Sequence, residues 1–426
     1  MSEGQPKVAR VPGFDGLRAF AALMVFVFHS WTFGIGFSDL GPWVDRVGTM
    51  PFELASKAFG NFGAQGVALF YVISAFLLYR PFLKARAAGA QSPNLRSYSI
   101  RRIARIFPAY WLALIVIASI NGDASELFSL QGLVDWVLLG HIYSVSEIYS
   151  NPVPTSWTIA VELSFYIFLP LWSLAVARVT ARRGFSLGRD LSVLGLLAAF
   201  GSIWQIVAVQ GATLHNAFQP RLVVLPASLN VFAAGMALAV LSVHADSNRA
   251  GTVASVLRRC APLAWPIGLA SFVLLCVAAD PDGSLGLGWQ ARTLSVAWLK
   301  IPVALAIVLP LVAGGLREGK DSASRPVRLL TGRVFAALGV VSYGIYLWQL
   351  FVMERLFHGD TLSLGTPTLV LFIPASLLAL GVTALIAAAS WFGLERRTIA
   401  AAHRRTRQRS GPRTQLLKEE PRRSSL

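Results

Sequence analysis

Cysteine and charge are both scarce in this sequence, and each scarcity excludes a class of protein. The two cysteines are Cys260, at the end of a polar stretch, and Cys276, inside an apolar run. This arrangement suits neither a disulfide framework nor a metal site. Charged residues make up 14% of the chain and hydrophobic residues 55%. Because soluble domains contain about 25% charged residues, the composition excludes an ordinary soluble protein.

Several familiar signatures are missing as well. The first twelve residues are polar and lack the apolar region of a signal peptide, so we expect the first apolar run to act as the insertion signal. There is no internal repeat and no glycine-rich phosphate loop with its lysine. The formal net charge is +17, but the basic residues lie in short segments between apolar runs and in the tail. That placement argues against a nucleic-acid partner.

Apolar runs of membrane-spanning length dominate the chain. They predict an all-α polytopic membrane protein with about ten transmembrane helices. The predicted spans are 15–36, 61–79, 106–120, 156–177, 191–210, 225–242, 262–279, 293–315, 334–356 and 368–394.

A further segment, 131–143, is short and contains Asp135. If it crossed the bilayer, every later loop would change sides, and most of the later basic residues would lie outside. Since Lys and Arg favour the cytoplasmic side, we predict a re-entrant or interfacial segment, with both termini in the cytoplasm and the protein in the inner (plasma) membrane. The predicted organisation is a cytoplasmic segment 1–12, a transmembrane domain 13–395 and a basic disordered cytoplasmic tail 396–426.

The first span carries two ionisable residues, Arg18 and His29. They are eleven residues apart, so on a helix they share one face and lie about 16 Å apart along its axis. Ionisable groups inside a membrane are costly and are therefore candidates for function. The alternative for His29 is a histidine that only hydrogen-bonds to a neighbouring helix.

The segment 80–105 is predicted to be a basic cytoplasmic loop, with Pro81, Gly89 and Pro93 as helix breakers. Arg102 and Arg105 close it and share a face if the third helix begins early. Arginine forks suit phosphate, so an anionic ligand is one interpretation. Positive charge that only sets topology or contacts lipid phosphate is the other.

Polar residues also occur inside the fourth and ninth spans. With Ser156 as helix cap, Glu162 lies about 9 Å into the membrane, where a carboxylate needs a partner or a proton. A protonated Glu162 bound to a backbone carbonyl is the structural alternative. In the ninth span the polar residues fall at helical spacing, as they would for substrate binding or for interhelical contact alone. The candidate substrate-binding residues are Trp157, Tyr166, Ser342, Tyr346 and Gln349.

In their order along the chain, five motifs resemble the membrane-bound acyltransferase family 3, bacterial integral membrane O-acyltransferases. The resemblance covers about residues 11–395. The motifs are Phe14-Asp15-Gly16-Leu17-Arg18 with His29, the segment 69–77 (LFYVISAFL), Arg102-Ile103-Ala104-Arg105, Ser156-Trp157-Thr158 with Glu162, and Ser342-Tyr343-Gly344-Ile345-Tyr346-Leu347-Trp348.

The resemblance implies a cytoplasmic acyl-CoA donor, usually acetyl-CoA, as a substrate rather than a permanently bound cofactor. It also implies an essential arginine and histidine, matched by Arg18 and His29, and a pair of arginines, matched by Arg102 and Arg105. Two positions depart from the family pattern. Ala75 follows Ser74 where the family often has glycine, and Gln349 stands where it often has histidine, so Gln349 has no acid or base role.

Together these observations predict transfer of an acyl group from acyl-CoA to a hydroxyl of a sugar, glycolipid or glycosylated metabolite, and the resemblance implies that the group is acetyl. His29 and Glu162 are the candidate catalytic residues. His29 acts either as a general base or as an acyl carrier, with Glu162 orienting it. Arg18, Arg102 and Arg105 are expected to bind the donor phosphates. Many relatives carry an extracytoplasmic hydrolase-like domain, and its absence here favours a small acceptor.

Depth along the helices predicts two polar layers. His29, Glu162 and Gln349 fall in the outer half of the bilayer, and the three arginines lie at the inner surface, about 16 to 20 Å away. An extended pantetheine arm would have to bridge such a gap. Two rival classes remain: a transporter of an acidic or phosphorylated solute, which also needs charged groups between helices, and a non-catalytic membrane scaffold. The acceptor, the acyl length and the oligomeric state do not follow from the sequence.

Overall fold

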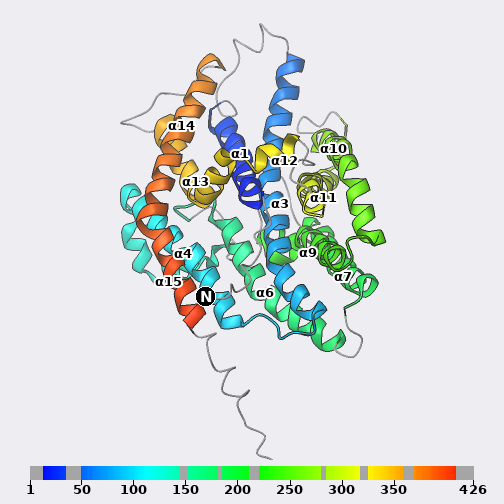
Figure 1. Ribbon diagram of the computed structural model, residues 1–426. Coiled ribbons are helices and arrows are strands. Elements are labelled where there is room, and N and C mark those ends of the chain that lie inside the picture. Colours follow the sequence, from blue (N-terminus) through cyan, green and yellow to red (C-terminus); the bar gives the residue numbers. More distant parts are fainter. Residues whose placement is uncertain are drawn as a thin grey trace, which may run out of the picture.

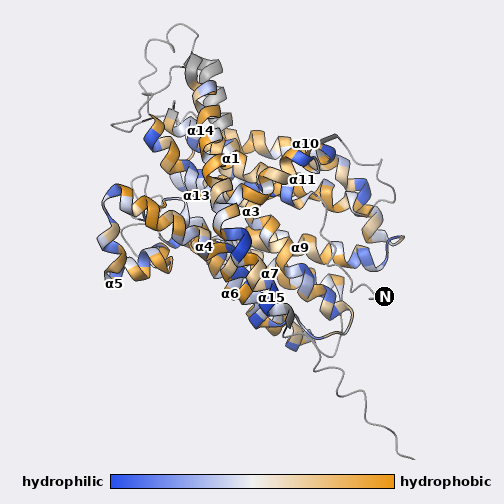
Figure 2. Ribbon diagram, turned by 60° about the vertical axis from the view of Figure 1, so that its left-hand side comes forward, coloured by the Kyte–Doolittle hydropathy of each residue, from blue (hydrophilic) through white to orange (hydrophobic). Residues whose placement is uncertain are grey.

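The structure is a computed structural model of the chain. It describes residues 13–34, 49–143, 151–180, 185–210, 220–279, 285–316, 325–357 and 369–408. All regular secondary structure in these ranges is helical, and ten of the helices there are long and apolar enough to cross a membrane. This confirms the predicted all-α polytopic fold (Figure 1). The colouring in Figure 2 shows that apolar residues predominate along the long helices.

The ten candidate spans match the ten predicted runs, although several helices extend further than the apolar run itself. They belong to α1 (Phe14–Gly34), α3 (Thr49–Ala87), α4 (Leu95–Asn121), α6 (Ser156–Thr180), α7 (Leu187–Val209), α9 (Leu225–Ser247), α10 (Thr252–Ala279), α11 (Trp289–Gly314), α13 (Arg333–Phe357) and α14 (Leu369–Ser390) with its extension. The short helices α8 (Pro220–Val223) and α12 (Arg325–Leu330) precede α9 and α13.

The described residues between α4 and α6, 122–143 and 151–155, do not form a spanning helix. They contain the short helical turns η1 (Ala124–Phe128), α5 (Leu130–Gly132), η2 (Leu133–Val137) and η3 (Gly140–Tyr143). Phe128 and Leu130 are almost fully exposed, as expected for side chains that face lipid or its interface. The prediction that 131–143 does not cross is thus consistent with the structure.

Helix α3 runs through the middle of the bundle (Figure 1) and packs against α1, α6, α9 and α11. Helix α1 in turn packs against α13. Glycine permits a close approach at two places on α1, because a Cβ on Gly339 of α13 would overlap the backbone of Asp15, and a Cβ on Gly16 would overlap the backbone of Leu330 at the end of α12. Small residues at such positions are how membrane helices come close together. These contacts fix the helix turn that carries Arg18.

The predicted loop 80–105 is wrong over most of its length. Helix α3 continues through Pro81 to Ala87, and α4 begins at Leu95. Proline removes one helical hydrogen bond and strains the preceding turn. The following residues, Phe82 and Leu83, are buried in the core, and that burial offsets the cost.

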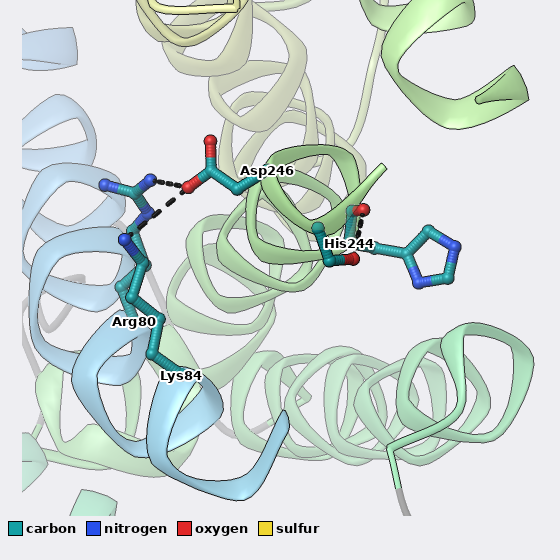
Figure 3. Close-up of polar contacts among 5 residues, drawn as sticks. Arg80, Lys84, His244 and Asp246 are labelled. Atoms are coloured by element: carbon teal, nitrogen blue, oxygen red, sulfur yellow. Dashed lines mark hydrogen bonds and ion pairs between the residues drawn. The ribbon is translucent and has the colours of Figure 1, made fainter. Parts of the chain in front are cut away.

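Ion pairs also hold this end of α3. Arg80 Nη2 lies 2.5 Å from Asp246 Oδ2 of α9, and Lys84 Nζ lies 3.5 Å from the same oxygen. Figure 3 shows both side chains pointing at Asp246, while His244 points away. Two residues after Lys84, Arg86 Nη2 lies 2.5 Å from Asp190 Oδ2 of α7. We call Arg80, Lys84 and Arg86 the α3 cluster.

The predicted disorder of the tail 396–426 is wrong for its first part. A π-helical turn, η6 (Trp391–Glu395), joins α14 to helix α15 (Arg396–Gln408). Helix α15 packs against α4 and buries Ala402 and Thr406. The many charged residues of this segment had indicated disorder, although its small buried face is sufficient for packing. Residues 409–426 and the segment 1–12 lie outside the described residues.

Candidate active site

A cavity of about 60 Å³ lies among α1, α3, α4, α6 and α13. Its lining includes most of the predicted site residues. Its polar lining comprises Arg18, Tyr71, Ser74, Arg105, Thr158, Glu162, Tyr166, Ser342, Tyr343 and Tyr346. The cavity is therefore the candidate active site.

Arginines gather at one end of the cavity, and we call Arg18, Arg102 and Arg105 the donor cluster. Asn94 caps α4 by accepting a hydrogen bond from the Ser97 amide at 2.9 Å, so the helix begins well before Arg102, and Arg102 and Arg105 share a face. Arg18 of α1 interacts electrostatically with both. Three cations from two helices thus converge.

Carboxylates lie near the donor cluster but pair with it weakly: buried Glu395 interacts electrostatically with Arg105 and forms no ion pair with it among the described residues. Arg18 Nη1 lies 3.8 Å from Asp15 Oδ1, and the Asp15 side chain is half exposed. Within the described ranges no carboxylate forms an ion pair with Arg102 or Arg105. The Arg102 guanidinium instead lies 5.8 Å from the ring centre of Tyr98 and 5.7 Å from that of Tyr166. Aromatic faces stabilise a cation without neutralising it, so the cluster retains its attraction for an anion.

Glu162 occupies the middle of the cavity wall. Its carboxylate accepts hydrogen bonds from the Ser74 hydroxyl and, at 2.6 Å, from the Tyr166 hydroxyl. Tyr166 in turn lies against Arg102. His29, the predicted partner, is not among the hydrogen-bond partners of Glu162. The direct contacts of this carboxylate therefore connect it to the donor cluster.

His29 lies beside Gln349 of α13, whose amide interacts with the imidazole. His29 Nδ1 is buried, and no hydrogen-bond partner for it occurs among the residues described. Gln349 Nε2 donates to the Tyr346 carbonyl at 3.2 Å. The Tyr346 hydroxyl pairs with Thr158 Oγ1 at 2.6 Å, next to the cavity. Neither His29 nor Gln349 lines the cavity itself.

A continuous series of polar side chains therefore links His29 to the donor cluster through the bundle. It passes from Gln349 to Tyr346 and Thr158, then past Tyr71, which interacts with both Tyr346 and Glu162. Tyr71, Ser74 and Thr158 were not predicted as site residues from the sequence. The available signal was that they are polar residues within predicted spans, because polar groups in a membrane helix tend to face the protein interior. Trp157, a predicted substrate residue, packs against the apolar core and does not line the cavity.

His141, in η3, was also missed. It is fully buried, with Nδ1 2.9 Å from the Asp135 carbonyl and Nε2 3.3 Å from Ser156 Oγ. Burial lowers the pKa of His141, which favours its neutral form. The residue fixes the start of α6 and hence the helix that carries Thr158 and Glu162. No spacing in the sequence connects it to them.

In the part of the chain that the structure describes, no group of three or more His, Cys, Asp or Glu residues is arranged to hold a metal ion. The polar groups of the cavity are instead arginines, hydroxyls and one carboxylate. Such a set can bind an anion at one end and hold uncharged polar atoms along the wall.

Comparisons with known proteins agree with these features. Nodulation protein 10 of Rhizobium leguminosarum bv. viciae is 28% identical over 366 residues, covering 80% of this chain and 83% of its own. Peptidoglycan O-acetyltransferase OatA of Listeria monocytogenes is 23% identical over 405 residues, 90% of this chain. This chain spans about half (55%) of the OatA protein. Acyltransferase MdmB of Streptomyces mycarofaciens is 26% identical over 184 residues, which are 42% of this chain and 43% of MdmB.

No solved structure matches the chain. The family model described as an acyltransferase domain matches residues 11–388, which contain the donor cluster, His29, Glu162 and the polar residues of α13. The chain is therefore a member of the membrane acyltransferase family 3.

Proposed function

We propose that this protein is an integral membrane O-acyltransferase that uses cytoplasmic acyl-CoA, with acetyl-CoA as the donor, and acylates a hydroxyl of a sugar, glycolipid or glycosylated metabolite. Family membership and relatives named as O-acetyltransferases support the reaction class. The cytoplasmic placement of both termini rests on the distribution of basic residues.

The observation that carries the proposal is the cavity, whose lining combines Arg18 and Arg105 with the hydroxyls of Thr158 and Tyr346. The donor cluster supplies forked cations for the CoA phosphates. The cavity gives the pantetheine arm a path away from them, towards the α13 residues that adjoin His29. Donor binding therefore needs no permanently bound cofactor.

His29 is the proposed catalytic residue. As a general base, its imidazole takes the proton of the acceptor hydroxyl while the new ester C–O bond forms and the thioester C–S bond breaks, and the CoA thiolate then takes a proton. As an acyl carrier, the imidazole first bonds to the acyl carbon while the thioester C–S bond breaks, and the leaving CoA thiolate takes the imidazole proton. The acceptor oxygen then bonds to the acyl carbon while the C–N bond to the imidazole breaks, and the hydroxyl proton returns to the imidazole. Gln349, beside the ring, orients it in either route.

Glu162 is the second proposed catalytic residue, and its contacts support a role on the donor side. Its carboxylate fixes the Tyr166 hydroxyl, and Tyr166 supports Arg102. Influence on His29 would pass through Thr158, Tyr346 and Gln349 rather than through a direct bond. Ser342, Tyr343 and Tyr346 line the cavity and are proposed to contact the arm or the acceptor.

The test uses purified full-length protein in lipid nanodiscs with acetyl-CoA and candidate acceptors. Release of free CoA thiol that depends on acceptor is expected, and H29A should abolish it while CoA binding remains. C260S, at an exposed position, is the matched control and should behave as wild type. A protein that moves an acidic solute across vesicles and releases no thiol is a transporter, and this result would overturn the proposal.

The acceptor can be found without guessing it. Surface glycolipids and secreted metabolites are compared by mass in cells with and without the gene. A loss of 42 mass units from one molecule, about the increment of an acetyl group, would identify donor group and acceptor together. Unchanged masses in both fractions would argue against a sugar, glycolipid or glycosylated metabolite as acceptor.

A further inference from the structure

Helix α15 returns to the bundle and lies along α4 (Figure 1). Its buried residues, Ala402 and Thr406, are four apart, and Thr398 lies one turn before them. Small side chains at this spacing form one face of a helix and allow a close approach to α4. His403 follows the buried Ala402 directly and lies at the edge of this face.

The consequence is that two arginines and an imidazole lie close together outside the cavity. His403 of α15 interacts electrostatically with Arg101 and Arg102 of α4, and its side chain is exposed. The ion pairs among the described residues include none for Arg101, Arg102 or Arg105. Arg102 Nε is buried without a hydrogen-bond partner in the described part of the chain. Neighbouring cations without a carboxylate repel one another, and a bound anion relieves that repulsion.

The chemistry of the donor provides two separate anions. The diphosphate of CoA adjoins the pantetheine arm, and the ribose carries an additional phosphomonoester on the far side. Arg18 and Arg105 line the cavity, so they face the arm and the diphosphate. Arg101 and His403 do not line the cavity. Arg101 lies near α15, the helix that carries His403.

Resting on the proposed function, we infer that Arg101, Arg102 and His403 form a second anion subsite, which binds the ribose phosphomonoester of acyl-CoA. Helix α15 is thereby part of donor recognition. The subsite distinguishes CoA from donors that lack this phosphate, because a terminal dianion meets forked guanidinium donors and an imidazole there.

The experiment compares acetyl-CoA with acetyl-dephospho-CoA, which lacks only the monoester, in full-length protein in phosphatidylcholine nanodiscs. Wild type should prefer acetyl-CoA. R101Q and H403Q should each raise the KM for acetyl-CoA roughly five- to tenfold, leave kcat unchanged and leave acetyl-dephospho-CoA unaffected. H403K should restore most of the preference. R404Q, an exposed change on the same helix, is the matched control and should retain it.

Thermal stabilisation by CoA and by dephospho-CoA is measured in parallel and needs no acceptor. The subsite is supported if CoA stabilises wild type more than dephospho-CoA does and H403Q removes this difference. If the same protein then shows no acyl transfer, the proposed function is wrong and the subsite still stands. Equal effects of H403Q on both donors would overturn the inference and reduce α15 to a packing element. Loss of the wild-type preference on adding phosphatidylglycerol would also overturn it, by showing a lipid phosphate in the subsite.

Discussion

Two groups of basic residues in this protein look alike in sequence and differ in structure. The α3 cluster faces the carboxylates of Asp190 and Asp246 at 2.5 to 3.5 Å. In the donor cluster the only ion pair among the described residues is the 3.8 Å contact of Arg18 with half-exposed Asp15, and Glu395 interacts electrostatically with Arg105 without pairing with it. The first group is therefore paired with carboxylates of its own chain, whereas Arg102 and Arg105 form no ion pair in the described part of the chain.

The difference separates a structural role from a binding role. Buried ion pairs fix how helices pack, and breaking one leaves a charge without a partner. Cations that converge without carboxylates oppose one another in the empty protein and favour an anionic ligand. Positive residues at a membrane surface all satisfy the topology rule, so their acidic partners decide which of them can serve a ligand.

The largest expected effect is on the donor cluster. R102Q/R105Q should lower kcat/KM for acetyl-CoA, because two charge-assisted phosphate contacts are lost. The expected loss corresponds to a rise of about 3 to 6 kcal/mol in the activation free energy. Steady-state kinetics in nanodiscs measures this. The melting temperature should not fall, since mutual repulsion is removed. A double variant with normal donor kinetics would reduce these arginines to topology signals.

Next in size is the buried pair of the α3 cluster. D190N should destabilise the protein by about 3 kcal/mol, because Arg86 is left in the core without its partner. The thermal unfolding curve in detergent measures the loss, and the KM for acetyl-CoA of the remaining folded protein should be unchanged. The R86M/D190L pair is the control and should recover most of the stability. If D190N raised the KM and left the melting curve unchanged, the comparison between the clusters would fail.

A smaller loss is expected at Asp246, whose side chain is 26% exposed. D246N should cost about 1 kcal/mol, since water partly replaces the lost partner of Arg80. The same unfolding measurement applies, with D190N as the reference. A loss as large as that of D190N would show that the two pairs share one buried network.

The smallest effect is expected at Lys84, which is 53% exposed and 3.5 Å from Asp246. K84Q should change stability by less than about 0.5 kcal/mol. Its melting curve should overlay that of wild type, and its donor kinetics should match. A clear drop in melting temperature would mean that Asp246 depends on both cations, contrary to the ranking by burial.

Much of the fold could be predicted from the sequence, because apolar runs of spanning length have one stable outcome in a bilayer. The short segment 131–143 was also assigned correctly, since Asp135 and the balance of basic residues opposed a crossing. Helix ends were less predictable. Pro81 and the charges of residues 396–408 resembled breakers and disorder, but burial of Phe82 and Ala402 outweighs those local preferences.

The sequence by itself determined which residues are candidates for the chemistry, through the cost of placing ionisable groups such as Arg18, His29 and Glu162 within apolar runs. Only the tertiary structure decided their partners. It placed Glu162 with Ser74 and Tyr166, and His29 with Gln349. Depth along a helix can be counted from sequence, but the direction of a side chain depends on how neighbouring helices rotate and approach. That arrangement is set by long-range packing, including the contacts at Gly16 and Gly339, which no local pattern contains.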